Sequence, residues 1–318
     1  MSTDGVTKAP APTEFAGRLA DSISSTLRGK PEAVRLALAT LLSGGHLLLE
    51  DMPGTGKTLL SRAIAASIGG SFGRVQCTPD LLPSDITGTS VFRPDTAEWE
   101  FRAGPLFSNV LLVDEINRAS PRTQSALLQP MEERHLSIDG RTWSLPEPFF
   151  CVATQNPYGQ VGTFPLPESQ LDRFALSMSL GLPDRAAERE VLSGIGGTAA
   201  LEAVGAVTQA RELQRAIEAT AGIWCAEAIL DYVLDLVDAT RASPHLGQGA
   251  TPRASVGLVR LARGHAVVSG RDHVTPDDVQ AVFVGATAHR VLVGDLVDPR
   301  AAREVLAEVL ATVPVPRP

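Results

Sequence analysis

Residues 51–58 form a glycine-rich segment that reads Asp-Met-Pro-Gly-Thr-Gly-Lys-Thr. Glycines let successive backbone N–H groups point at one anion, and a helix N-terminus adds the positive end of its dipole. Lys57 would place a charge on the β- and γ-phosphates of a nucleotide, and the Thr58 hydroxyl would bind Mg²⁺. The general phosphate-loop pattern has glycine at the first position, where this chain has Asp51.

The surroundings of this segment favour a phosphate loop over the alternative, an ordinary turn. An aliphatic run at 46–50 precedes it, and 57–68 has the apolar spacing of a helix. A strand before the loop and a helix after it are the context that phosphate binding requires. We therefore assign nucleotide contact to Pro53, Gly54, Thr55, Gly56, Lys57, Thr58 and Leu59.

Two acidic residues, Asp114 and Glu115, end a second aliphatic run that begins at Val110. At the end of a strand beside the phosphate loop, Asp114 would hold Mg²⁺, and Glu115 would polarise the water that attacks the γ-phosphate. Two solvated acids at a strand end are the alternative. A switch GTPase would use a glutamine and a guanine-reading Asn-Lys-x-Asp, and a small-molecule kinase would not need Glu115. The pair therefore favours ATP hydrolysis with Mg²⁺ as cofactor.

These residues need a sheet to position them. Besides 46–50, short apolar strands are expected at 72–77, 109–114, 148–154 and 174–180, with helices between them. This alternation predicts an α/β fold with a mostly parallel sheet and helices on both faces.

Two β-hairpins interrupt the alternation. One pairs 90–93 with 99–101, and the other pairs 135–138 with 141–145 around Asp139-Gly140, a strong two-residue turn signal.

The pattern changes near 183–186. From 184 to 313 it is amphipathic helix with no convincing strand. We expect a flexible tail over 1–14, an α/β nucleotide-binding domain over 15–183 and a small all-α domain over 184–318.

Composition narrows the function classes. The 318 residues carry 28 Lys+Arg and 36 Asp+Glu, a net charge of −8, which disfavours a nucleic-acid track or a membrane surface as partner. Hydrophobic content of 44% excludes global disorder. No apolar run is long enough to cross a bilayer, and no secretory signal is visible. Three widely spaced cysteines predict a cytoplasmic location.

Four stretches make the chain resemble the MoxR family of AAA+ ATPases: residues 114–124, 127–133, 153–157 and 167–174. The first two look like that family's Walker B region. Together the stretches span most of 30–183, and the helical C-terminal region is similar to the family's lid in length and position. MoxR-like phosphate loops often lack the first glycine, so Asp51 agrees with the resemblance.

The resemblance implies two roles near the acids. Asn156 corresponds to sensor 1, a polar side chain that helps to position the lytic water; a turn-forming Asn before Pro157 is the alternative. Arg173 resembles the arginine finger that acts on the ATP of a neighbouring subunit. An ion pair with Asp172 or Glu168 is the alternative for Arg173, and both can hold.

The same resemblance implies roles for two further arginines. Arg253 resembles sensor 2, which would contact the γ-phosphate from the lid. Arg118 either acts across a subunit boundary or forms a surface salt bridge. The two hairpins are similar to inserts of this AAA+ branch that project toward a pore or a client. Trp99 and Trp143 would grip a polypeptide there, or would pack across strands.

The resemblance implies an ATPase that forms a homo-oligomer, a hexameric ring, and remodels, matures or activates a protein client. Such proteins are chaperone-like, sometimes insert metal cofactors, and often have a partner with a von Willebrand factor A (VWA) domain. No nucleic acid partner and no membrane insertion are expected. A nucleic-acid motor and a nucleotide-gated switch with little turnover are the competing functions.

Overall fold

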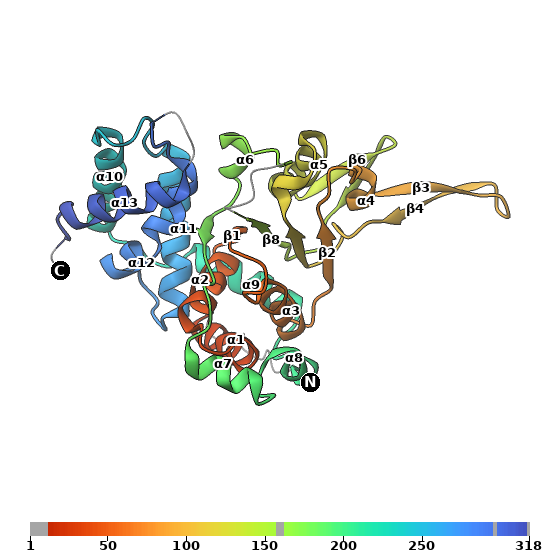
Figure 1. Ribbon diagram of the computed structural model, residues 1–318, viewed down its shortest axis with the longest axis horizontal. Helices are drawn as coiled ribbons and strands as arrows, with labels where there is room; N and C mark the ends of the chain where they lie inside the picture. The colour runs from red at the N-terminus through yellow and green to blue at the C-terminus, as the bar shows by residue number, and fades with distance from the viewer. Residues whose placement is uncertain (1–11, 157–161, 295–297, 317–318) are drawn as a thin grey trace, which may run out of the picture.

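The computed structural model describes residues 12–156, 162–294 and 298–316 (Figure 1). Its centre is a parallel sheet of five strands in the order β2-β5-β8-β1-β9. The strands are β1 (Leu47–Glu50), β2 (Phe72–Gln76), β5 (Val110–Asp114), β8 (Phe150–Gln155) and β9 (Leu176–Met178). The predicted parallel α/β sheet is confirmed, so the carboxyl ends of these strands meet at one edge.

Alternate residues of the three central strands, β5, β8 and β1, face two different cores. Leu47 and Leu49 pack with α1 (Pro12–Thr26), α2 (Pro31–Leu42) and α3 (Lys57–Ser67). Leu48 packs on the other face, with α4 (Pro83–Thr87), α5 (Pro121–Glu133) and α6 (Glu168–Leu171). Because side chains alternate across a strand, a strand buried on both faces must be apolar throughout.

The N-terminal helix is longer than the sequence predicted. α1 begins at Pro12, so residues 12–14 of the expected flexible tail are helical. Proline is tolerated in the first turn of a helix, and Glu14 there complements the helix dipole. The rest of that tail, residues 1–11, lies outside the described residues.

Both predicted hairpins are present. β3 (Gly88–Arg93) pairs with β4 (Glu98–Ala103), and β6 (His135–Ile138) pairs with β7 (Arg141–Ser144). Asp139 and Gly140 have φ values of 51° and 75°, as a two-residue hairpin turn requires. The β3–β4 hairpin extends far from the body of the molecule (Figure 1).

The C-terminal region is helical, as predicted. The helices are α7 (Arg185–Leu192), α8 (Gly197–Ala203), α9 (Ala210–Ala221), α10 (Glu227–Ala242), α11 (Pro252–Val268), α12 (Pro276–Thr287) and α13 (Pro299–Thr312). Two short 3₁₀ helices, η1 (Ile116–Arg118) and η2 (Ala288–Arg290), complete the described elements. Among the described helices, none is long and apolar enough to span a membrane.

These helices divide into two groups. α8 packs on α1 and α3, and α9 packs on α1 and α2, so both belong to the nucleotide-binding body together with α7 (Figure 1). α10, α12 and α13 pack with one another, α10 and α12 also pack with α11, and this second group joins the body where α11 packs along α2 and where α12 packs on β9. Gly264 of α11 permits this approach, since a Cβ there would lie 2.3 Å from the Ala39 carbonyl oxygen. The composition change near 183–186 marks the end of the sheet, whereas the second group of helices begins with α10.

Candidate functional site

The loop between β1 and α3 has the geometry of a phosphate cradle. Gly54 and Gly56 adopt φ values of 87° and 99°, which favour glycine. α3 begins at Lys57, directly after the loop, and its N-terminus opens onto a cavity of about 420 Å³. Six of the seven residues predicted to contact nucleotide line this cavity: Pro53, Gly54, Gly56, Lys57, Thr58 and Leu59.

Thr55, the seventh, is buried beneath the loop. Its carbonyl accepts a hydrogen bond of 2.7 Å from Nζ of Lys30, which also donates to the Gly181 carbonyl at 2.5 Å. Burial lowers the pKa of Lys30, and the charge of Asp51 partly opposes that shift. Sequence reasoning missed Lys30, because its contacts join three separate parts of the chain.

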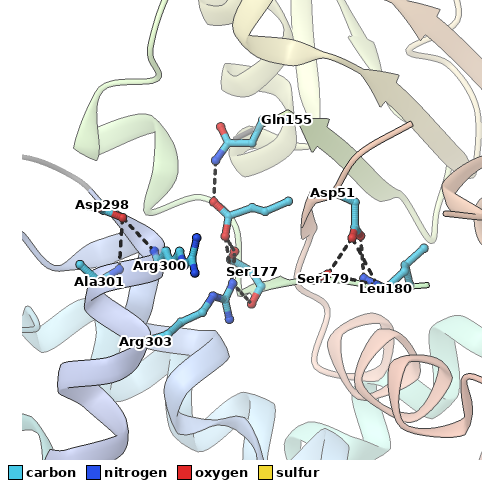
Figure 2. A network of polar contacts seen from close by, with 11 residues as sticks. Asp51, Gln155, Ser177, Ser179, Leu180, Asp298, Arg300, Ala301 and Arg303 are labelled. Carbon is cyan, nitrogen blue, oxygen red and sulfur yellow. Dashed lines mark hydrogen bonds and ion pairs between the residues drawn. The ribbon is translucent and has the colours of Figure 1, made fainter. Parts of the chain in front are cut away.

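Asp51 holds the start of the loop. Its carboxylate accepts hydrogen bonds from the Ser179 hydroxyl at 2.6 Å, the Leu180 backbone N–H at 2.6 Å and the Gly181 backbone N–H at 3.2 Å (Figure 2). Lys57 donates to the backbone carbonyls of Asp51 and Met52 at 2.9 and 3.1 Å. Asp51, which stands where the general pattern has glycine, therefore anchors the phosphate loop to the segment that follows β9.

The two predicted acids line the same cavity as the loop. Asp114 is buried, and its carboxylate forms an ion pair of 2.8 Å with Arg74 of β2. Glu115 has a left-handed backbone with φ of 55°, and its N–H donates to the Thr154 hydroxyl at 2.9 Å. Its carboxylate pairs with Arg118 at 2.8 Å, so the surface salt bridge expected as one alternative for Arg118 is present.

The residues of this cavity fit a magnesium nucleotide. Thr58 and Asp114 supply hard oxygen donors of the kind that Mg²⁺ prefers. Lys57, Arg62 and Arg74 supply positive charge for phosphates. The volume lies within the range of small-molecule sites.

Several cavity residues were missed by sequence reasoning: Arg62, Arg74, Gln76, Thr154, Gly197, Thr198 and Leu201. Arg74 and Gln76 are polar residues at alternate positions of β2, which pairs with β5. This alternation could have predicted from the sequence that both side chains lie on one face of the sheet, next to the acids. The α8 residues carry no motif, and they reach the cavity only because α8 packs on α3.

Asn156 directly follows β8, which lies between β5 and β1 in the sheet. Its position at the carboxyl end of β8 places it at the same sheet edge as Asp114 and the phosphate loop. Pro157, on which the turn alternative depends, lies outside the described residues.

Arg173 and Arg253 lie together at a second cavity of about 240 Å³, which shares no lining residue with the first among the described residues. Both pair with Glu132, at 3.4 Å from Arg173 and 2.6 Å from Arg253. Arg253 also pairs with Asp172 at 3.3 Å. Arg173 was expected to form an ion pair with Asp172 or Glu168, and it pairs with Glu132 instead.

Arg253, predicted to contact the γ-phosphate from the lid, lines the second cavity and not the one that holds the phosphate loop of the same chain. α11 packs along α2, and this packing holds the start of α11 beside the end of α6. Arg253 consequently faces the same way as Arg173 and not toward the phosphate loop.

A buried arginine that sequence reasoning missed supports Arg173. Arg290 donates from Nη2 to the carbonyls of Asp172 and Phe174, at 3.1 and 2.9 Å, and so holds the residues on both sides of Arg173. Its Nε lies 3.0 Å from the Asp172 carboxylate, and its side chain is 6% exposed. His289 contacts the same Phe174 carbonyl at 2.9 Å. Burial, with the nearby charge of Arg290, lowers the pKa of His289 to about 3.

Comparison with known proteins agrees with this geometry. Residues 46–176 match the ATPase family associated with various cellular activities (AAA), and residues 238–310 match the AAA lid domain. Chaperone MoxR1 of Mycobacterium tuberculosis is 43% identical over 91% of this chain and 79% of its own length. YeaC of Bacillus subtilis is 41% identical over 94% of both chains. The structure of a candidate ATPase from Cytophaga hutchinsonii superposes with a TM-score of 0.84 at 31% identity, over 96% of this chain and 97% of that one. The chain is therefore an ATP-hydrolysing enzyme of the MoxR family of AAA ATPases.

Proposed function

We propose that the chain hydrolyses ATP at a site completed by a second copy of itself, within a hexameric ring, and that the cycle remodels, matures or activates a protein client. The observation that carries this proposal is the separation of two cavities. The phosphate loop and the acids line one, whereas Arg173 and Arg253 line another. An arginine pair that is offered on a different surface suits the ATP of a neighbour.

In this proposal each residue has a limited task. Lys57 and the loop amides bind the phosphates, and Glu115 orients the attacking water once Arg118 releases its carboxylate. Asn156 helps to place that water. Thr58 and Asp114 would hold Mg²⁺, which neutralises charge on the phosphates when bound. Arg173 and Arg253 of the neighbour would stabilise charge on the transferred phosphoryl group.

A protein client is supported by the relatives and by the hairpins. The M. tuberculosis relative is named a chaperone. Trp99, near the end of the long β3–β4 hairpin, is 69% exposed and therefore available to a partner. A VWA-domain partner, metal-cofactor insertion and a cytoplasmic location extend the family resemblance, and three free cysteines support a reducing compartment.

The test mixes two inactive variants. Lys57→Ala cannot bind nucleotide productively, and Arg173→Ala cannot complete its neighbour's site. Each alone should lose turnover. Mixed assemblies should regain part of it, because some interfaces combine an intact loop with an intact Arg173. The matched control is Arg35→Ala, which removes an exposed pair with Glu32 and should leave turnover unchanged. Mixtures as inactive as the single variants would contradict the shared site.

Two other functions make different predictions. A nucleic-acid motor would use positive charge on the hairpins, and one of their arginines, Arg93, is paired with Asp95 and Glu100. Stimulation of ATPase by DNA or RNA would favour that function. A nucleotide-gated switch with little turnover would be favoured if Glu115→Gln hydrolysed ATP as fast as the native chain.

A further inference from the structure

A buried carboxylate lies at the junction of the phosphate loop, the central sheet and the last helix. Glu50 ends β1, and its side chain is 8% exposed. Gln155 donates to one carboxylate oxygen at 2.7 Å. The other accepts from the Ser177 hydroxyl at 2.6 Å and from Arg303 of α13 at 2.9 Å. Gln155, Ser177 and Arg303 thus come together from β8, β9 and α13 (Figure 2).

Glu50 and its partner Gln155 are each adjacent in sequence to a residue of the nucleotide site. Asp51, which anchors the phosphate loop, follows Glu50 directly. Asn156 follows Gln155 directly, and Glu50 and Gln155 are register partners in the parallel sheet. Any displacement of the Glu50 carboxylate therefore acts on the start of the phosphate loop and on the position of Asn156 together.

Arg303 is the charged group that reaches this point from the lid. α13 packs against α10, α12 and η2, which belong to the group of helices outside the nucleotide-binding body. Nη2 of Arg303 donates to Glu50, and it also donates to the Ser177 carbonyl and hydroxyl at 3.2 and 3.0 Å. The contact joins residues 253 positions apart, and it links the lid to two adjacent strands of the sheet.

Stability alone is a weak reason for such a contact. Burying the Glu50 carboxylate costs several kcal/mol, and Arg303 is 31% exposed to water, so the ion pair adds little net stability over a well-packed apolar pair. It does fix a geometry, because a buried carboxylate with three donors has few alternative arrangements.

We propose that Arg303 is a positioning residue that couples the helical lid to hydrolysis. By holding Glu50, and through it Gln155, Arg303 sets the phosphate loop and Asn156 in their working positions when the lid is docked. A lid displacement that withdraws Arg303 slows turnover without removing any group that touches ATP. The part that concerns Asn156 rests on the role proposed for it above.

The contacts of Arg303 suggest an informative conservative variant. A single nitrogen, Nη2, makes all of its contacts to Glu50 and Ser177. A lysine ammonium carries three donors on one nitrogen and can replace that group. Arg300, one turn earlier on the same helix, is exposed and provides the matched control.

The experiment compares Arg303→Met, Arg303→Lys and Arg300→Met in the full chain, with steady-state ATPase kinetics and direct ATP binding. For Arg303→Met we expect kcat to fall roughly ten- to hundredfold while the Kd for ATP changes less than about threefold, because misplacement affects the reacting geometry more than the phosphate contacts. Arg303→Lys should recover most of kcat, and Arg300→Met should match the native chain. The backbone amides of Met52 and of residues 54–58 should exchange hydrogen faster in Arg303→Met.

The double variant Glu50→Gln/Arg303→Met removes both charges of the pair and keeps the test valid if the single variant fails to fold. It should fold and retain the low kcat. Native kcat in a folded Arg303→Met or double variant, or a lysine variant as slow as the methionine variant, would overturn the proposal. A native chain that binds ATP but does not hydrolyse it would instead count against the proposed function.

Discussion

Nε and Nη2 of Arg74 both lie 2.8 Å from Oδ2 of Asp114, the carboxylate assigned to the metal. The Arg74 side chain is 51% exposed, whereas that of Asp114 is 10% exposed. If Asp114 holds Mg²⁺ as proposed, the guanidinium occupies one of its two carboxylate oxygens, and metal binding competes with the ion pair.

Arg74→Ala should consequently lower the Mg²⁺ concentration for half-maximal ATPase. A partly exposed ion pair stabilises the metal-free site by up to about 1 kcal/mol, so we expect that Mg²⁺ concentration to decrease two- to fivefold. The measurement is a magnesium titration at saturating ATP, with Arg35→Ala as the control. An increased magnesium requirement would mean that Arg74 orients Asp114 for the metal and does not compete with it.

Arg290→Met should destabilise the segment that carries Arg173. The substitution leaves Asp172 with one cationic partner and removes the donor to two carbonyls, so the free energy of unfolding should fall by about 3–5 kcal/mol. Chemical denaturation measures this loss. Arg260→Met, at the exposed rim of the same cavity, should change it by less than about 1 kcal/mol. Equal effects of the two substitutions would show that Arg290 is not a support.

Two buried histidines predict a stability loss in mild acid. Burial, together with the charge of Arg134, lowers the pKa of His46 to about 3, and His289 is lowered to about 3 as well. The unfolded chain takes up these protons near pH 6.5 and the folded chain does not. The free energy of unfolding is therefore unaffected by these two histidines above pH 6.5, and it falls as the pH drops from 6.5 toward 3.

Each histidine should contribute a slope of about 1.4 kcal/mol per pH unit below pH 6. Denaturant titrations between pH 4.5 and 7 should show that His46→Gln removes one such slope. His245→Gln, at an exposed position, is the control. An unchanged slope in His46→Gln would mean that His46 becomes protonated in the folded chain.

The two hairpin tryptophans should behave differently on substitution. Trp143 stacks on Phe101 with ring centroids 4.4 Å apart, so Trp143→Ala should lower the unfolding free energy by about 1–2 kcal/mol. Trp99 is largely exposed and packs across the hairpin on Phe92 alone among the described rings, with centroids 5.5 Å apart, so Trp99→Ala should lower it by less than about 1 kcal/mol. Thermal unfolding of both variants measures the difference. A larger loss of unfolding free energy in Trp99→Ala than in Trp143→Ala would mean that Trp99 has a structural role and is not available to a client.

The sequence predicted the parts of this molecule that depend on local patterns. The parallel sheet follows from short aliphatic runs between helical stretches, and the β6–β7 turn follows from Asp139-Gly140. The phosphate loop and the acids met as expected, because parallel strands bring their carboxyl ends to one edge.

What the sequence did not predict depends on contacts between distant segments. Lys30, Arg74, Arg290 and Arg303 carry no motif, and their partners are set by helix packing and strand order. Contact with the γ-phosphate was assigned to Arg253 from its place in the lid. The docking of α11 on α2 decides its position, which is beside Glu132. Such docking results from many apolar contacts that no short stretch encodes.

The anchored Asp51 has a consequence for consensus engineering of this chain. Asp51 does not have the positive φ that makes glycine necessary at Gly54 and Gly56, so glycine offers no relief of strain at this position. Repairing the motif by Asp51→Gly would delete the carboxylate that holds residues 179–181, and it would leave the Leu180 N–H without its acceptor. The substitution that improves agreement with the general phosphate-loop pattern is thus the one that should loosen the loop.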